Sequence, residues 1–254
     1  MKSGVGVRLL ALAALTLTAI WFGLVDNSWL DRRPVQRLLF LGHSLTYYND
    51  MPAMVGKMAD SANSPIRYDI TMSAFPNAGL DNHWNNQRTR ELLGQGGWDR
   101  VIAQPERSYE PQGPDGRMYF YADKLLVGTG RGTPAVIISQ HFDDSFYRQQ
   151  NWTTSRYEDG QTLQKNLRSL ASATGADVVD VASVWERVRM EQLPFSLYKD
   201  GNHPSLEGSY LAALVIYAKL TGGRVDKVTY VPSGMSSEHA ALLRKNVQLA
   251  LDGG

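Results

Sequence analysis

Short apolar runs and longer amphipathic stretches alternate along the chain from residue 35 onward. Apolar runs of strand length, each closed by a turn-forming residue, occur at 37–41, 66–72, 98–104, 133–139 and 177–181. Helical patterns follow at 50–62, 80–93, 118–127, 156–174, 182–192 and 205–220. Regular alternation of strands with helices predicts a mostly parallel five-stranded sheet that carries helices on both faces.

The first apolar run stops abruptly at Gly42, which is followed by His43 and Ser44. An uninterrupted apolar run is typical of a strand that is buried on both faces. Open α/β sheets bind ligands beyond the carboxyl ends of their strands, so Ser44 is a candidate nucleophile. The alternative is an ordinary turn serine.

The first residues differ from the rest of the chain. Lys2 and Arg8 precede the uncharged stretch 9–25, an arrangement typical of an export signal. Residues 1–33 are expected to be a signal anchor, or else a cleaved signal peptide, plus a linker, and residues 34–254 to be one domain. The basic start would leave that domain outside the cytoplasmic membrane, in the periplasm or the extracellular space, held at the membrane by the N-terminal helix.

Composition narrows the chemistry further. The 26 Lys and Arg residues balance 25 Asp and Glu residues and are scattered, which argues against a nucleic-acid partner. The absence of cysteine excludes disulfides, thiolate metal sites and a cysteine nucleophile. The five histidines are dispersed and do not form a helical zinc-binding pair, so no metal and no cofactor is predicted.

A second informative stretch is the polar loop 198–205, which contains Asp200 and His203 and leads into an apolar helix. A serine hydroxyl becomes a good nucleophile when an imidazole takes its proton, and a carboxylate orients that imidazole. Asp200 and His203 could supply both groups from one turn. The alternative is a plain turn before the helix.

Acyl transfer also requires donors for the oxyanion. The candidates are the backbone N–H of Ser44, the N–H of Gly79 after the second strand, and the side-chain amide of Gln104 at the end of the third strand.

These residues together resemble the SGNH/GDSL hydrolases. Residues 42–45 are similar to the nucleophile block of that family, Gly79 to its glycine block, Gln104 to its asparagine block, and Asp200 with His203 to its final Asp-x-x-His block. Residues 47–52 and 197–212 further resemble one bacterial, exported branch, and the likeness spans about 35–222. His43 and Gln104 depart from the residues common in the family, and an alignment with that branch puts Asn77 in the place of Gly79.

The resemblance implies a flavodoxin-like three-layer α/β/α sandwich, the SGNH hydrolase fold, and ester hydrolysis without a metal. Ser44 would attack the acyl carbonyl, His203 would act as general base and then acid, and Asp200 would orient His203. Four further residues are candidates for the substrate pocket, although structural roles for them stay open: His43, Asn77, His83, and His141 in the polar loop 140–155.

The expected function is therefore that of a serine esterase that removes acetyl-like O-acyl groups from carbohydrate or other small esters. Two alternatives stay open. One is a non-catalytic carbohydrate-binding or scaffold protein of the cell envelope, and the other is an O-acyltransferase that uses the same three residues.

Overall fold

The computed structural model describes residues 31–105, 117–127, 129–139, 143–150 and 156–253. Residues 35–254 form one compact unit. The predicted signal anchor or signal peptide lies outside the described residues. In the part of the chain that is described, no helix is long and apolar enough to span a membrane.

The centre of the fold is a parallel five-stranded sheet, as the sequence predicted. Its strands are β1 (Val35–Gly42), β2 (Arg67–Ala74), β3 (Arg100–Ala103), β4 (Ala135–Ile138) and β5 (Asp177–Asp180). They lie in the order β2-β1-β3-β4-β5, the order of flavodoxin-like folds. All four pairings are parallel, and Gly42 at the end of β1 lies beside Ala74 at the end of β2.

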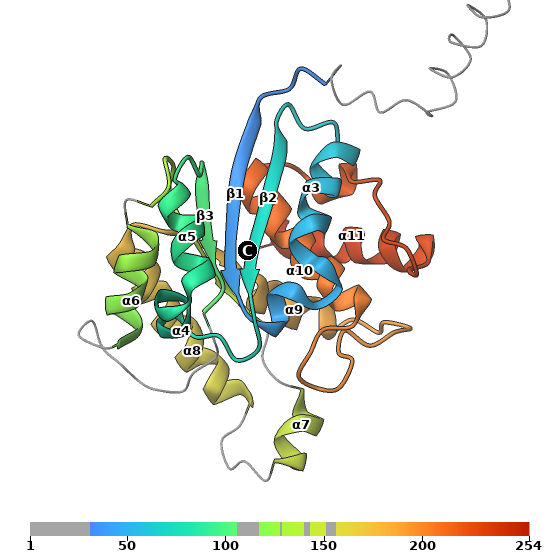
Figure 1. Ribbon diagram of the computed structural model, residues 1–254. Helices are drawn as coiled ribbons and strands as arrows, with labels where there is room; N and C mark the ends of the chain where they lie inside the picture. Colours follow the sequence, from blue (N-terminus) through green and yellow to red (C-terminus); the bar gives the residue numbers. More distant parts are fainter. Residues whose placement is uncertain (1–30, 106–116, 128, 140–142, 151–155, 254) are drawn as a thin grey trace, which may run out of the picture. The chain divides into compact units, whose positions relative to one another are not determined.

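Helices cover both faces of this sheet (Figure 1). One face carries α3 (Met51–Ser61), α9 (Val181–Arg189), α10 (Leu206–Thr221) and α11 (Ser237–Asp252). The other carries α4 (Leu80–Asn85), α5 (Gln87–Gln95), α6 (Arg117–Leu126) and α8 (Arg156–Thr174).

Strand β1 contributes to both cores. Leu38 and Phe40 belong to the core beneath α3 and α10, whereas Leu39 and Leu41 belong to the core beneath α5, α6 and α8. All four side chains are at most 1% exposed. Because successive strand residues point to opposite faces, burial on both sides explains why the run is apolar without interruption. It also makes β1 a rigid support for the residues that follow it.

The helices differ from the sequence prediction at several places, three of them outside the Ser44 turn. The single helix expected over 80–93 breaks at Asn86, whose side chain accepts a hydrogen bond from the Thr89 N–H at 3.0 Å and so starts a new helix, α5. The expected polar loop 140–155 contains the short helix α7 (Asp144–Gln149). The final helix α11, which Ser236 caps by accepting from the His239 N–H, was not predicted.

Candidate active site

The turn after β1 presents Ser44. Ser44 is the first residue of the short helix α2 (Ser44–Tyr47), and the carbonyl of His43 accepts hydrogen bonds from the N–H groups of Thr46 and Tyr47 at 2.8 and 3.2 Å. Gly42 is needed because a Cβ at that position would lie 1.9 Å from Thr46 Oγ1. Ser44 is half-buried, so it sits at the surface of a tightly packed turn.

Asp200 and His203 form a hydrogen-bonded pair, as their spacing predicted. Asp200 Oδ2 lies 2.8 Å from His203 Nδ1, and Oδ1 accepts from the backbone N–H groups of His203 at 2.7 Å and Asn202 at 3.0 Å. A carboxylate only accepts, so Nδ1 carries the proton and Nε2 of the neutral ring is left as an acceptor.

The hydrogen bonds to Asp200 also set its charge state. Partial burial acts to raise the pKa of Asp200, but the hydrogen bonds from the His203 backbone, the His203 imidazole and the Asn202 backbone outweigh burial and lower the pKa below its usual value. Asp200 is therefore a carboxylate at neutral pH, the form that can orient and stabilise an imidazolium.

The Ser44 turn and the His203 loop are joined by the segment that follows α2, which includes the 3-10 turn η2 (Tyr48–Asp50). The rings of Tyr48 and His203 are stacked, with centroids 4.4 Å apart and planes 4° from parallel. The Asn49 side chain donates to the Ser205 carbonyl at 3.1 Å. Among the described residues, Ser44 Oγ and His203 Nε2 do not share a hydrogen bond. Catalytic hydrogen bonds often tighten only when substrate is bound.

The predicted oxyanion donors differ in their availability. The N–H of Ser44 has no acceptor among the described residues. The N–H of Gly79 donates instead to Asn82 Oδ1 at 2.9 Å, because the asparagine caps the first turn of α4. This contact differs from the expectation that Gly79 faces an oxyanion.

Gln104 bridges the carboxyl ends of two strands. Its Nε2 donates to Ser139 Oγ, just after β4, at 2.8 Å, and its Oε1 accepts from Thr46 Oγ1 in α2. The side chain is 3% exposed, and one N–H of its amide is left for another acceptor. Gln104 thereby ties the helix that carries Ser44 to the sheet.

The candidate pocket residues separate into two kinds. His43 and His83 are buried, with 4% and 1% of their surfaces exposed. Both therefore lie inside the protein and not on the wall of an open pocket. Asn77 is exposed and has a left-handed backbone with φ of 52°, on the loop between β2 and α4. His141 lies outside the described residues.

His83 supports the nucleophile turn from below. Its Nε2 lies 3.0 Å from the carbonyl oxygen of Gly42, and its Nδ1 lies 3.2 Å from Thr89 Oγ1. The carbonyl only accepts, so Nε2–H donates to it. Burial lowers the pKa of His83, and the hydrogen bond to Gly42 offsets this only in part. A neutral His83 therefore fixes the peptide that leads into His43 and Ser44.

The segment after β4 also contacts the site. The backbone N–H of Asp143, which precedes α7, donates to the carbonyl of Gly201 at 2.7 Å. Gly201 has a φ of 79°, which favours glycine, and a Cβ there would approach Ser145 Oγ and Phe146 Cβ to 3.2 Å. The described part of the polar loop 140–155 thus packs directly against the loop of Asp200 and His203.

The sequence analysis did not predict that Tyr48 and Asn49 contact the loop of Asp200 and His203. Residues 47–52 were noted as part of the family resemblance, but nothing local to them indicates a contact with His203 or Ser205.

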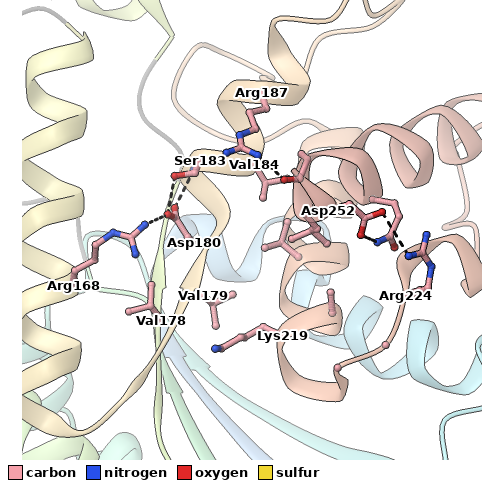
Figure 2. Close-up of a pocket in the computed structure, with 17 residues that line it drawn as sticks. Arg168, Val178, Val179, Asp180, Ser183, Val184, Arg187, Lys219, Arg224 and Asp252 are labelled. Carbon is pink, nitrogen blue, oxygen red and sulfur yellow. Dashed lines mark hydrogen bonds and ion pairs between the residues drawn. The ribbon is translucent and has the colours of Figure 1, made fainter. Parts of the chain in front are cut away.

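A large cavity of about 590 Å³ lies elsewhere, beside β5 and between α8, α9, α10 and α11 (Figure 2). Ser44, Asp200 and His203 do not line it. Charged side chains that line it already have partners within the protein. Arg168 pairs with Asp180, and Arg187 donates to the Ala250 carbonyl at 2.7 Å. Cavity size therefore does not identify the site in this chain.

No protein-family model and no curated protein matches the chain. Solved structures do match it. A DUF4886 family protein from Bacteroides uniformis has a TM-score of 0.66 at 14% identity, over 85% of this chain and 95% of its own. A candidate SGNH hydrolase from Slackia heliotrinireducens has a TM-score of 0.58 at 25% identity, over 74% and 100%. A variant of an acetyl xylan esterase from Geobacillus stearothermophilus has a TM-score of 0.54 at 15% identity, over 78% and 97%.

These likenesses confirm the fold expected from the sequence, a three-layer sandwich around a parallel sheet. They support an ester-acting hydrolase of the SGNH type as the class of the protein. The chain is thus similar in fold to SGNH hydrolases, at 14 to 25% identity to the three structures named.

Proposed function

We propose that this hydrolase is a serine esterase that removes short, acetyl-like O-acyl groups from carbohydrate or other small esters. One observation carries the proposal. The imidazole of His203 is hydrogen-bonded to Asp200 at 2.8 Å, and it stacks on Tyr48, which lies one helical turn after Ser44.

In the proposed reaction, Ser44 Oγ attacks the acyl carbonyl while His203 Nε2 takes the serine proton. The Asp200 carboxylate accepts from Nδ1–H throughout and stabilises the imidazolium. The imidazolium then protonates the leaving alcohol, and an acyl-enzyme ester is left on Ser44. Water, deprotonated by His203, attacks this ester and releases the carboxylic acid, which regenerates the serine hydroxyl.

The oxyanion would be held by the backbone N–H of Ser44, which is free to donate. The second N–H of the Gln104 amide is a side-chain candidate, since Gln104 is bonded to Thr46 within the Ser44 turn. Gly79 would serve only after exchanging its hydrogen bond to Asn82. Asn77, exposed on the same loop, is a further candidate for contact with substrate.

The substrate class rests on two supports. The fold is shared with an acetyl xylan esterase, and residues 1–33 are expected to bring the domain across the cytoplasmic membrane, where acylated envelope carbohydrate occurs. Both supports favour a short acyl group on a sugar hydroxyl over a long-chain lipid.

The test is hydrolysis of p-nitrophenyl acetate, butyrate and octanoate, and of acetylated xylo-oligosaccharide, by the purified full-length chain. We expect the acetyl esters to be preferred, and Ser44→Ala to lower kcat/KM by at least about 10³-fold. Equal rates for the wild type and Ser44→Ala would overturn the proposal. A preference for octanoate would reject the short acyl group.

A second measurement separates the esterase from the alternatives. Labelling of Ser44 by a fluorophosphonate probe, absent in Ser44→Ala and slow in His203→Ala, is expected of an activated serine and not of a carbohydrate-binding scaffold. Mass spectrometry of the products with a sugar acceptor present distinguishes free acetate, expected here, from acetylated acceptor, expected of a transferase.

A further inference from the structure

The Tyr48 ring lies flat against the imidazole of His203. Their centroids are 4.4 Å apart and their planes differ by 4°. The ammonium of Lys199 also lies over the Tyr48 ring, 5.3 Å from its centroid. Tyr48 is half-buried. Its ring is therefore held by contacts on the same loop that carries Asp200 and His203.

Tyr48 is also coupled to the nucleophile turn. Its backbone N–H donates to the carbonyl of Ser44 and closes α2. Residues four apart on a helical turn lie on the same face, so Tyr48, the residue that ends α2, is placed one turn along from Ser44. Tyr48 thus contacts Ser44 through its backbone and His203 through its ring, although the two residues are far apart in the sequence.

The backbone of this segment is anchored to the start of α10. Ser209 Oγ, in a residue that is 1% exposed, accepts from Asn49 Nδ2 at 2.8 Å and lies 3.3 Å from the Tyr48 carbonyl, to which it donates. Asn49 and Asp50 both have positive φ, 55° and 50°, a conformation that Asn and Asp tolerate better than other side chains. These contacts fix the backbone of Tyr48, and with it the point from which the ring extends.

The stacked Tyr48 ring restricts a rotation of the His203 imidazole that the hydrogen bond to Asp200 alone does not restrict. The χ2 torsion of histidine is broad, and the carboxylate that holds Nδ1 sits on the same exposed loop, with 46% of its side chain accessible. A ring packed parallel to the imidazole restricts its rotation out of plane. With Nδ1 bonded to Asp200, restriction of the plane sets the direction of Nε2.

We propose that Tyr48 is a positioning residue that holds the His203 imidazole in the plane in which Nε2 faces Ser44. The role belongs to the aromatic ring and not to the hydroxyl, and it rests on the proposed function of Ser44 and His203. Misplacement of a catalytic group by about 1 Å can cost about 10²-fold in rate, so the loss of the ring should affect kcat.

The first test compares steady-state kinetics on p-nitrophenyl acetate. Tyr48→Leu and Tyr48→Met, which keep apolar volume without a flat ring, should lower kcat by about 10- to 100-fold and leave KM within about twofold. Tyr48→Phe should restore kcat to within about threefold of the wild type. Tyr121→Leu is the matched control, because the Tyr121 ring lies in α6 and contacts Phe120.

The second test reads the imidazole directly. Protons above an aromatic face resonate upfield, so the ring C–H signals of His203 should move downfield in Tyr48→Leu and Tyr48→Met and stay in place in Tyr48→Phe. The signals of His239 should not move. A normal thermal melting curve for at least one of the two aliphatic variants shows that the fold is retained.

The outcomes are distinct. An active wild type with unchanged kcat in Tyr48→Leu and Tyr48→Met overturns the positioning role and leaves the esterase intact. A Tyr48→Phe variant as slow as Tyr48→Leu also overturns it, since the hydroxyl would then be the important group. A wild type no faster than Ser44→Ala rejects the proposed function itself.

Discussion

The described residues include two imidazole–carboxylate pairs with similar hydrogen bonds. His203 Nδ1 lies 2.8 Å from Asp200, and His239 Nδ1 lies 3.0 Å from Glu207. The side chain of His203 is 23% exposed and that of His239 is 31% exposed. The length of the hydrogen bond and the exposure of the imidazole therefore do not tell them apart.

Their neighbours do tell them apart. His203 stacks on Tyr48, whose backbone closes the turn of Ser44. His239 lies in the first turn of α11, tilted by 42° against Phe195, and its partner Glu207 lies in the first turn of α10. The second pair joins two helices. An imidazole–carboxylate pair becomes a catalytic base only when a nucleophile is within reach, and only the first pair is tied to one.

The largest expected difference is between the two histidines. His203→Gln should lower kcat/KM for p-nitrophenyl acetate by at least about 10³-fold, because the amide cannot take the serine proton. His239→Gln, the matched control, should leave kcat/KM within about twofold. Steady-state kinetics of the two full-length variants measures this. Equal losses would remove the distinction between the pairs.

A smaller difference is expected between the two carboxylates. Asp200→Asn replaces an acceptor of the Nδ1 proton by a group that can impose the wrong tautomer, so kcat should fall by about 10²- to 10⁴-fold. Glu207→Gln should leave kcat near the wild-type value and act on stability alone, by about 1 kcal/mol or less. Kinetics and thermal melting of both variants provide the comparison. A kcat that is retained in Asp200→Asn would assign another orienting group to His203.

The sequence was sufficient for some of these features and insufficient for others. The run before Gly42 and the strand alternation predicted the sheet, and hence that Ser44 follows β1, because burial on both faces leaves a plain apolar signal. Asp200 and His203 could be paired because both lie on one loop. The pairing within the polar loop 198–205 could therefore be predicted from the local sequence alone.

Contacts between distant segments could not be predicted in this way. The stacking of Tyr48 on His203 and the hydrogen bond from Asn49 to Ser205 depend on how α10 packs beside α3. The hydrogen bond from the N–H of Gly79 to Asn82 was not predicted, because the capping role of Asn82 was not considered. His83 was left between pocket and core, because its burial depends on both Gly42 and Thr89.

His83 is a third imidazole for comparison, and its replacement should have the smallest effect on kcat. Both of its ring nitrogens are hydrogen-bonded within the protein. Burial lowers its pKa in the folded protein from the usual 6.5, and the carbonyl of Gly42 only partly opposes this. The unfolded chain therefore binds the proton more readily than the folded one. The stability that neutral His83 contributes is complete above the unfolded pKa and is lost as the pH falls below about 6.5.

We expect the free energy of unfolding of the wild type, measured by urea titration between pH 7.5 and pH 5, to fall more steeply than that of His83→Gln. One proton can account for at most about 1.4 kcal/mol per pH unit. Glutamine can still donate to the Gly42 carbonyl but does not titrate, so the Ser44 turn should keep its form and kcat should change little at pH 7.5. Parallel pH profiles for the two proteins would show that His83 carries its proton equally in both states, which contradicts the lowered pKa that burial imposes.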